Sequence, residues 1–247
     1  DSDGGNINFV TTVDGGQNLT LDAGAAGTGD ITFGGAVGGG TRLGAISITD
    51  ANDVTAVAIT AASLSQTTGS GTSTFNGAID TDAAAGVNVL TDTIALNSTI
   101  NTTNAGTVDL NADNNTGLAT GDLTIGLGAD ITSDGAVNLT GANGISTAGD
   151  VTTTGDVVNY NSATTLTDDG IAVSSADGDI TFVSTLDGTA DGVQTLDLDG
   201  GAGGSVVFTD AVGGGTRLGA ITIANANNVT AVGIRATSLA QTQGAGT

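Results

Sequence analysis

The sequence predicts an all-β protein, a β-solenoid of roughly ten coils with almost no helix. Three observations lead to this prediction. One long stretch occurs twice, short apolar alternations recur at even intervals, and most residue types that favour helices are missing. In a solenoid each coil covers only its neighbours, so the core is a narrow column that needs few large side chains.

The stretch that occurs twice is residues 37–46, which return letter for letter as residues 212–221, at a shift of 175 positions. The likeness extends on both sides, and residues 1–72 as a whole resemble residues 173–247. We therefore expect one continuous solenoid segment over residues 1–247, cut from a longer tandem array of such units.

Differences between the two copies indicate which side chains face inward. Thr60 in the first copy is Arg235 in the second, and an unpaired guanidinium could not replace threonine in a core. Varying positions and unchanged aliphatic positions alternate with the period of two that a half-buried strand requires. The unchanged aliphatic positions, which we expect to point inward, are Ile46, Ile48, Val57 and Ile59.

The remaining strands are predicted from apolar alternations that are bounded by Gly, Asn and Asp, the residues that favour turns. In chain order they lie at residues 7–13, 19–21, 31–33, 46–48, 57–59, 75, 87–90, 94–96, 108–110, 123–125, 137–139, 151, 157–158, 171–173, 180–182, 196–198, 206–208, 221–223 and 232–234. Even spacing would also allow a sandwich or a barrel. No linker separates compact units, however, and the strand pattern runs unbroken through the long repeat, which favours the solenoid.

The composition supports the same fold. The chain has no Pro, Cys, Met, Trp, His, Lys or Glu, so most good helix formers are missing. Its 42 glycines, with many Thr, Asn and Asp, favour turns and strands. Since only five Phe and one Tyr are present, we expect a thin core of Val, Ile, Leu and Ala.

The charge excludes some partners. A formal net charge of −23 argues against nucleic acid and anionic membrane surfaces. No apolar run approaches the roughly 20 residues of a membrane helix, so we expect no membrane insertion. An acidic chain without cysteine suits an extracellular setting that is rich in cations.

Short units of the sequence resemble the β-strand repeats of giant bacterial surface and secreted proteins, the filamentous-haemagglutinin-like and autotransporter-like adhesins. This resemblance implies a right-handed parallel β-helix, export to the cell exterior, and a role as stalk, fibre, matrix or adhesin. No secretion domain or receptor-binding module of that family is visible. The units that carry the resemblance are Gly-Asp-Ile-Thr-Phe (29–33), Gly-Ala-Val-Gly-Gly (35–39), Leu-Gly-Ala-Ile-Ser-Ile (43–48) and Thr-Phe-Asn-Gly-Ala (74–78).

Catalysis has few candidate residues. Without His, Cys, Lys or Glu, the common triads, Schiff-base lysines and phosphate-loop lysines are excluded. Arg42 with Asp50 or Asp53 could form an acid–base group, but both aspartates are asparagine in the second copy. We therefore expect no enzyme and no catalytic residues.

Calcium is the only cofactor that the sequence suggests. Asp109, Asn111 and Asp113 form the D-x-N-x-D opening of a calcium loop, yet Asn114 stands where that loop needs Gly. The same residues fit a strand that turns its polar side to solvent. Pairs of aspartates at turns are the other weak candidates, among them Asp1/Asp3, Asp80/Asp82, Asp177/Asp179 and Asp197/Asp199.

Together these observations predict a non-catalytic extracellular structural protein, a repeat segment of a long surface fibre, sheath, matrix or adhesin stalk. One alternative is a carbohydrate- or receptor-binding adhesin module, and another is a calcium-stabilised β-sandwich or surface-layer repeat. The expected partners are neighbouring repeats or copies of the chain, joined end to end or laterally, with divalent cations and surface glycans as further candidates. We also expect the recurrent Arg42 and Arg217 to meet aspartates of a neighbouring coil or filament.

Overall fold

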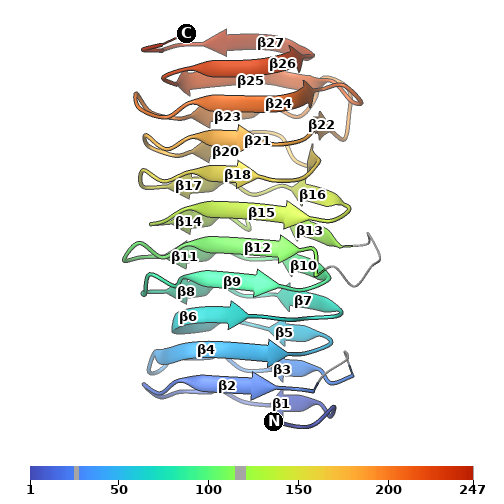
Figure 1. The fold of residues 1–247 in the computed structure, drawn as a ribbon, viewed down its shortest axis with the longest axis vertical. Coiled ribbons are helices and arrows are strands. Elements are labelled where there is room, and N and C mark those ends of the chain that lie inside the picture. Colours follow the sequence, from blue (N-terminus) through green and yellow to red (C-terminus); the bar gives the residue numbers. More distant parts are fainter. Residues whose placement is uncertain (25–27, 115–120, 247) are drawn as a thin grey trace.

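The computed structural model describes residues 1–24, 28–114 and 121–246. These residues form 27 strands, and every strand pairing is parallel. The described residues contain no helix, and so none that is long and apolar enough to cross a membrane. Figure 1 shows the strands stacked coil upon coil, from β1 at one end to β27 at the other. The predicted parallel β-solenoid of about ten coils is therefore confirmed.

Strands of successive coils pair in three ladders, which we call ladders A, B and C. Ladder A contains β1 (Ile7–Phe9), β3 (Ile31–Phe33), β5 (Val54–Ala56), β7 (Thr72–Phe75), β10 (Thr93–Leu96), β13 (Asp122–Ile125), β16 (Gly144–Thr147), β19 (Thr164–Leu166) and β22 (Leu186–Gly188). Ladder B contains β8 (Ile79–Thr81), β11 (Ile100–Thr102), β14 (Ile131–Ser133), β17 (Val151–Thr153), β20 (Ile171–Ser174), β23 (Leu196–Asp199), β25 (Leu218–Asn225) and β27 (Ala236–Gln241). Ladder C contains β2 (Leu19–Asp22), β4 (Leu43–Asp50), β6 (Ile59–Gln66), β9 (Val87–Leu90), β12 (Val108–Ala112), β15 (Val137–Gly141), β18 (Val158–Tyr160), β21 (Ile180–Phe182), β24 (Val206–Val212) and β26 (Val229–Ile234).

Two of the longer strands pass from one ladder to the next. The start of β6 pairs with β8 and its end pairs with β9. In the same way β24 pairs with β21 through Val206 and with β22 through Val212. Each of these strands therefore turns a corner and pairs with two strands of a neighbouring coil.

Coil length varies while most strand pairings keep their register. Ile7 pairs with Ile31, Val54 with Ser73 and Ile94 with Leu123, so these coils contain 24, 19 and 29 residues. Most of the difference in length lies between strands, because an insertion within a strand exchanges its inner and outer faces. Register shifts within strands occur in the pairings β2–β4, β23–β25 and β24–β26.

Aromatic rings stack within the core. The rings of Phe9 and Phe33 are 5.2 Å apart, and Phe182 lies 4.6 Å from Tyr160 and 5.4 Å from Phe208. All of these rings except that of Phe9 are almost fully buried. The prediction of a purely aliphatic core is therefore incomplete, because equivalent inward positions on successive coils allow aromatic side chains to pack face to face.

A column of buried hydroxyls also lies inside, at the strand ends of ladder B. Its members on successive coils are Thr81, Thr102, Ser133, Thr153 and Ser175. Thr102 Oγ1 donates to the carbonyl of Gly106 at 2.5 Å, and Ser133 Oγ donates to the same carbonyl at 2.9 Å. Thr153 and Ser175 likewise donate to the turn carbonyls of Asp156 and Gly178. These four hydroxyls satisfy turn carbonyls that would otherwise be buried without a donor, whereas Thr81 Oγ1 has no partner among the described residues.

The inward orientation predicted for Val57 is wrong. Val57 is 38% exposed, whereas Val54, Ala56 and Ile59 are buried. β5 ends at Ala56 and β6 begins at Ile59, so the turn between them resets the alternation. The strand predicted over residues 7–13 is interrupted for the same reason: β1 ends at Phe9, and Val10 is 77% exposed.

The two sequence copies have the same local structure but lie on different ladders. Ile31 pairs with Val54 in the first copy, and their counterparts Val206 and Val229 pair in the second. Ile31 belongs to ladder A, whereas Val206 lies on ladder C through its pairing with β21. The long unit therefore does not contain a whole number of coils, and its second copy is rotated by one ladder.

Candidate functional site

Arg42 connects three successive coils. It lies at the end of the loop 38–42, and its Nη1 donates to the carbonyls of Ala61 at 2.8 Å and Asp80 at 3.0 Å. Its Nη2 binds the Asp80 carboxylate, and its Nε lies 3.3 Å from Asp82 Oδ2. The expectation that this arginine meets aspartates of another coil is confirmed, but Asp80 and Asp82 lie on the second coil above Arg42 and not on the adjacent one. The pair Asp80/Asp82 thus binds a guanidinium instead of forming a free pair of carboxylates.

The second copy arranges its arginines differently. Arg217 Nη2 lies 3.1 Å from Asp191 Oδ2, in a loop of the preceding coil. Arg235 Nη1 donates to the carbonyl of Gly214 at 3.0 Å. The Arg217–Asp191 pair is the more open one, since Asp191 is 68% exposed against 44% for Asp80. Such exposed pairs contribute about 0–1 kcal/mol.

Several aspartates hold the turns of the next coil. Asp14 Oδ1 accepts the backbone N–H groups of Thr41 at 3.1 Å and Gly40 at 2.7 Å, and these bonds lower the pKa of Asp14. Asp187 makes the same two contacts to the loop of the second copy, at 2.8 and 3.0 Å. A carboxylate is a strong acceptor, so these groups fix the glycine-rich loops.

Two further carboxylates outside the loops of the repeated stretch have similar roles. The N–H of Ala105 and the hydroxyl of Thr154 both donate to Asp134 and lower its pKa. The hydroxyl and the N–H of Thr195 donate to Asp169 and lower its pKa in the same way. Acidic side chains on this surface therefore stabilise contacts between coils.

Asparagines form short ladders on the surface. Asn159 donates to Asn138 on the coil before it at 2.9 Å, and Asn97 donates to Asn76 at 3.0 Å. Asparagine side chains on successive coils therefore hydrogen-bond to one another along the stack.

The three residues of the candidate calcium loop do not converge on one point. Asp109 and Asn111 lie on the outer side of β12, and Asp113 is exposed beyond the end of that strand. Partial burial raises the pKa of Asp109. The later positions of such a loop include residues 115–120, which lie outside the described residues. Among the residues that are described, no three acidic side chains gather closely enough to hold a metal ion.

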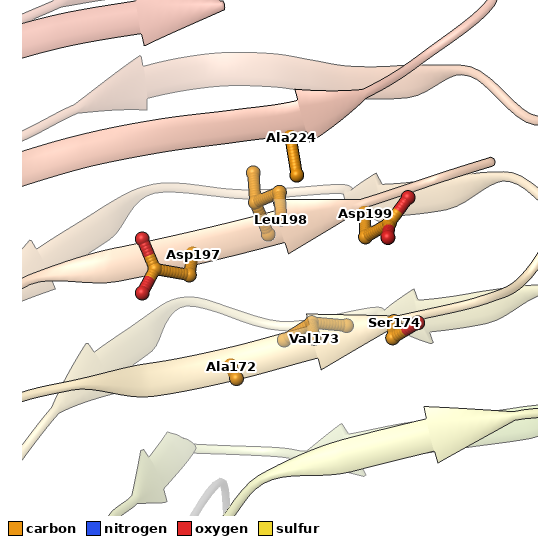
Figure 2. Close-up of a pocket in the computed structure, with 7 residues that line it drawn as sticks. All are labelled: Ala172, Val173, Ser174, Asp197, Leu198, Asp199 and Ala224. Atoms are coloured by element: carbon orange, nitrogen blue, oxygen red, sulfur yellow. The ribbon is translucent and has the colours of Figure 1, made fainter. Parts of the chain in front are cut away.

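Asp197 and Asp199, the other calcium candidates, border a shallow depression on ladder B. Figure 2 shows both carboxylates on β23, with the small side chains of Ala172 and Ser174 on the neighbouring strand. Asp199 Oδ1 accepts the N–H of Gly201 at 2.9 Å. The remaining lining residues are Val173, Leu198 and Ala224. The depression therefore offers two carboxylates beside small apolar groups and no third acidic ligand among the described residues.

Tyr160 is the one tyrosine of the chain, and it is buried. Burial, with a smaller effect of the Asp150 charge, raises the pKa of its hydroxyl. The ring stacks in the core, so this hydroxyl cannot exchange protons with a ligand on the surface.

Comparison with protein-family models, with curated proteins and with solved structures finds no match to this chain. The function must therefore be inferred from the fold and from its surface groups.

The sequence did not pair Arg42 with its partners, because 38 positions separate it from Asp80. The one available indication was that Asp80 and Asp82 share a parity opposite to that of Ile79, which places both on the outer face of a strand. Only the stacking of coils brings this outer face above the arginine.

Proposed function

We propose that this chain is a non-catalytic structural protein, a repeat segment of a long surface fibre, sheath, matrix or adhesin stalk outside the cell. The observation that carries the proposal is the unbroken chain of parallel strand pairings that links the first described coil, with β1, to the last, with β27. The coils share one column of buried side chains and are not divided into separate globular units.

Mechanical stiffness follows from this arrangement. In a stack of parallel strands the backbone hydrogen bonds run along the long axis, and each coil adds about 4.8 Å. Length is then set by the number of coils. Since the net charge is −23, repulsion keeps separate rods apart unless divalent cations bridge them.

The surface groups support a structural role. Asp14, Asp134, Asp169 and Asp187 accept hydrogen bonds from neighbouring coils, and Asp80 binds Arg42. These carboxylates are engaged in holding the stack together. The resemblance to repeats of bacterial surface proteins supports placing the rod outside the cell.

Small-angle X-ray scattering and single-molecule stretching would test the mechanical part. We expect an elongated particle with one cross-section throughout, which resists force until whole coils unravel. A compact or flexibly jointed particle would contradict it. Antibodies against the chain would test the location, since they should label intact cells of the source organism.

The depression beside Asp197 and Asp199 favours a second candidate, an adhesin module that binds glycans, because carboxylates accept hydrogen bonds from sugar hydroxyls. The aromatic rings point into the core, however, where they cannot stack on sugars. Glycan-array binding that is lost in Asp197→Asn, and kept in the distant Asp109→Asn control, would support this candidate. The alternative of a calcium-stabilised β-sandwich is wrong in its fold, since the strands form one parallel stack.

A further inference from the structure

The coil formed by β26 and β27 is hydrogen-bonded to the preceding coil along one edge. Its other edge, which faces away from the stack and which we call the outer edge, pairs with no strand of the described residues. In the described part of the chain β26 pairs only with β24, and β27 only with β25. Leu239 is 51% exposed on this coil, whereas its counterpart Leu64 in the first copy is 1% exposed. Arg235, which replaces Thr60 of the first copy, is also exposed here.

In the first copy, the strand that corresponds to the end of β26 and to β27 is β6, and its outer edge is covered by a further coil. β6 carries β8 on its outer edge, in parallel register, with Thr60 directly beside Asp80. Both side chains lie on the outer face of the stack. The Asp80 carboxylate is then bound by Arg42, which reaches over the intervening coil.

The counterpart of Arg42 is already engaged in the second copy. Four residues, 15–18, separate Asp14 from Leu19, whereas eight residues, 188–195, separate Asp187 from Leu196. The longer loop contains Asp191, which binds Arg217. Arg217 is thus turned away from the outer edge, towards the preceding coil.

Arg235 is the arginine that lies at the outer edge of the second copy, because Arg217 is turned away from it. In the register of the first copy, the residue opposite Arg235 on an added coil corresponds to Asp80, about 4.8 Å away along the stack. Its hydrogen bond to the Gly214 carbonyl leaves other guanidinium donors available. A chain with 26 acidic residues and three arginines has placed one of its few cations here.

We propose that the outer edge of β26 and β27 is a docking surface for a parallel β-coil that places a carboxylate opposite Arg235. Arg235 then holds this carboxylate in the way that Arg42 holds Asp80, from an adjacent coil instead of the second coil below. Apolar side chains of the docked coil cover Leu239, as β9 covers Leu64 in the first copy. The proposal concerns recognition between coils and does not depend on the extracellular role.

The test extends the full chain with a second copy of residues 73–112 after Thr247, which corresponds to Thr72 in the repeat. The extension supplies two coils with the sequence of the segment that covers β5 and β6. Hydrogen exchange of the β26 and β27 amides reports whether the added coils dock. We expect these amides to exchange at least about tenfold more slowly than in the unextended chain.

A double-mutant cycle isolates the carboxylate. Asp→Asn at the added position that corresponds to Asp80 should speed exchange at this edge by about three- to fivefold. In an Arg235→Thr background the same change should have no effect. Asp→Asn at the added counterpart of Asp109, on another ladder, is the matched control and should leave the edge unchanged.

Three results would overturn the proposal. The edge could stay unprotected in the extended chain, or the two Asp→Asn changes could act equally. The third is that the unextended chain dimerises in sedimentation and that Arg235→Thr abolishes the dimer. The occupant would then be the edge of a second copy, not a coil of the kind seen on β6.

Discussion

The two copies of the repeat have the same local structure in different surroundings. Leu43 pairs with Ala61 in the first copy, as Leu218 pairs with Ala236 in the second. In the first copy β6 is covered by β8 and β9, whereas its counterparts in the second copy, the end of β26 and β27, pair on one side only in the described part of the chain. Identical residues can therefore be core in one copy and surface in the other, because burial in a solenoid depends on the neighbouring coil.

The rotation by one ladder adds a second difference. The Phe9–Phe33 stack lies on ladder A, whereas the Phe182–Phe208 stack lies on ladder C. A rod built of such units would present equivalent surfaces in a spiral around its axis. No single side of the rod would carry the same groups along its whole length.

The largest effect is expected from truncating the same leucine in both copies. Leu64→Ala should lower the free energy of unfolding by about 2–5 kcal/mol, because it leaves a cavity between covered coils. Leu239→Ala should cost less than about 1 kcal/mol, because half of this side chain is already in solvent. Urea denaturation with hydrogen exchange would measure both, and equal losses would contradict the difference in burial.

Adding one methyl group to the shared loop should affect both copies alike. Gly38 and Gly213 have φ values of 71° and 67°, and a Cβ there would lie 1.9 Å from the Thr60 carbonyl and 2.1 Å from the Arg235 carbonyl. Gly38→Ala and Gly213→Ala should each cost about 1–3 kcal/mol through backbone strain. Gly39→Ala is the control, since its nearest contact is ordinary at 3.5 Å. Thermal melts would detect the losses, and an effect in one copy alone would show that the loops differ.

A smaller effect should separate the two arginines. Arg42→Ala removes contacts to two carboxylates and two carbonyls, and we expect a loss of about 1 kcal/mol after allowing for solvent screening. Arg217→Ala removes one open pair and should cost no more than about 0.5 kcal/mol. Both losses should shrink in about 1 M salt. If Arg217→Ala proved the more damaging in chemical denaturation, the coil-spanning role of Arg42 would be refuted.

The smallest effect on stability is expected from removing single carboxylates whose pKa is shifted, and this effect depends on pH. The lowered pKa of Asp14 means that its contribution is present above the pKa of the unfolded chain and is lost as pH falls through the lower folded value. Asp14→Asn should therefore destabilise at pH 7 and have no effect once both forms are neutral. Asp109, between the copies, has a raised pKa, so Asp109→Asn should stabilise at pH 7 and lose this advantage in acid. Denaturation curves across pH 2–7 would reveal opposite slopes, and parallel slopes would contradict these assignments.

Much of the strand pattern could be predicted because an inner residue is surrounded by the same kind of core on every coil. The alternation of inward and outward residues along a strand is enough to place Ile46, Ile48 and Ile59 inward correctly. It misplaces Val57 because a two-residue turn resets the parity, and no residue in the sequence marks where the turn falls. The buried hydroxyls escape prediction for a related reason, since Thr102 or Ser133 resembles a surface residue until a turn carbonyl lies beside it.

The candidate site was less predictable. The recurrence of Arg42 and Arg217 suggested contacts with aspartates, but their partners lie 38 positions after one and 26 positions before the other. The calcium candidates Asp109, Asn111 and Asp113 were chosen by spacing along the chain, which does not bring side chains together on an extended strand.

Residue order and composition were enough to establish that the chain is all β, that it repeats, and, away from turns such as the one at Val57, which aliphatic side chains point inward. These properties depend on local propensity and on a period of two, which applies in the same way beside any neighbouring coil. The stacking in space was needed to assign each copy to its ladder, each arginine to its partner and each end coil to its exposure. Those properties depend on how many residues each turn contains before the chain reaches the next strand of the stack. Small differences in turn length accumulate from coil to coil.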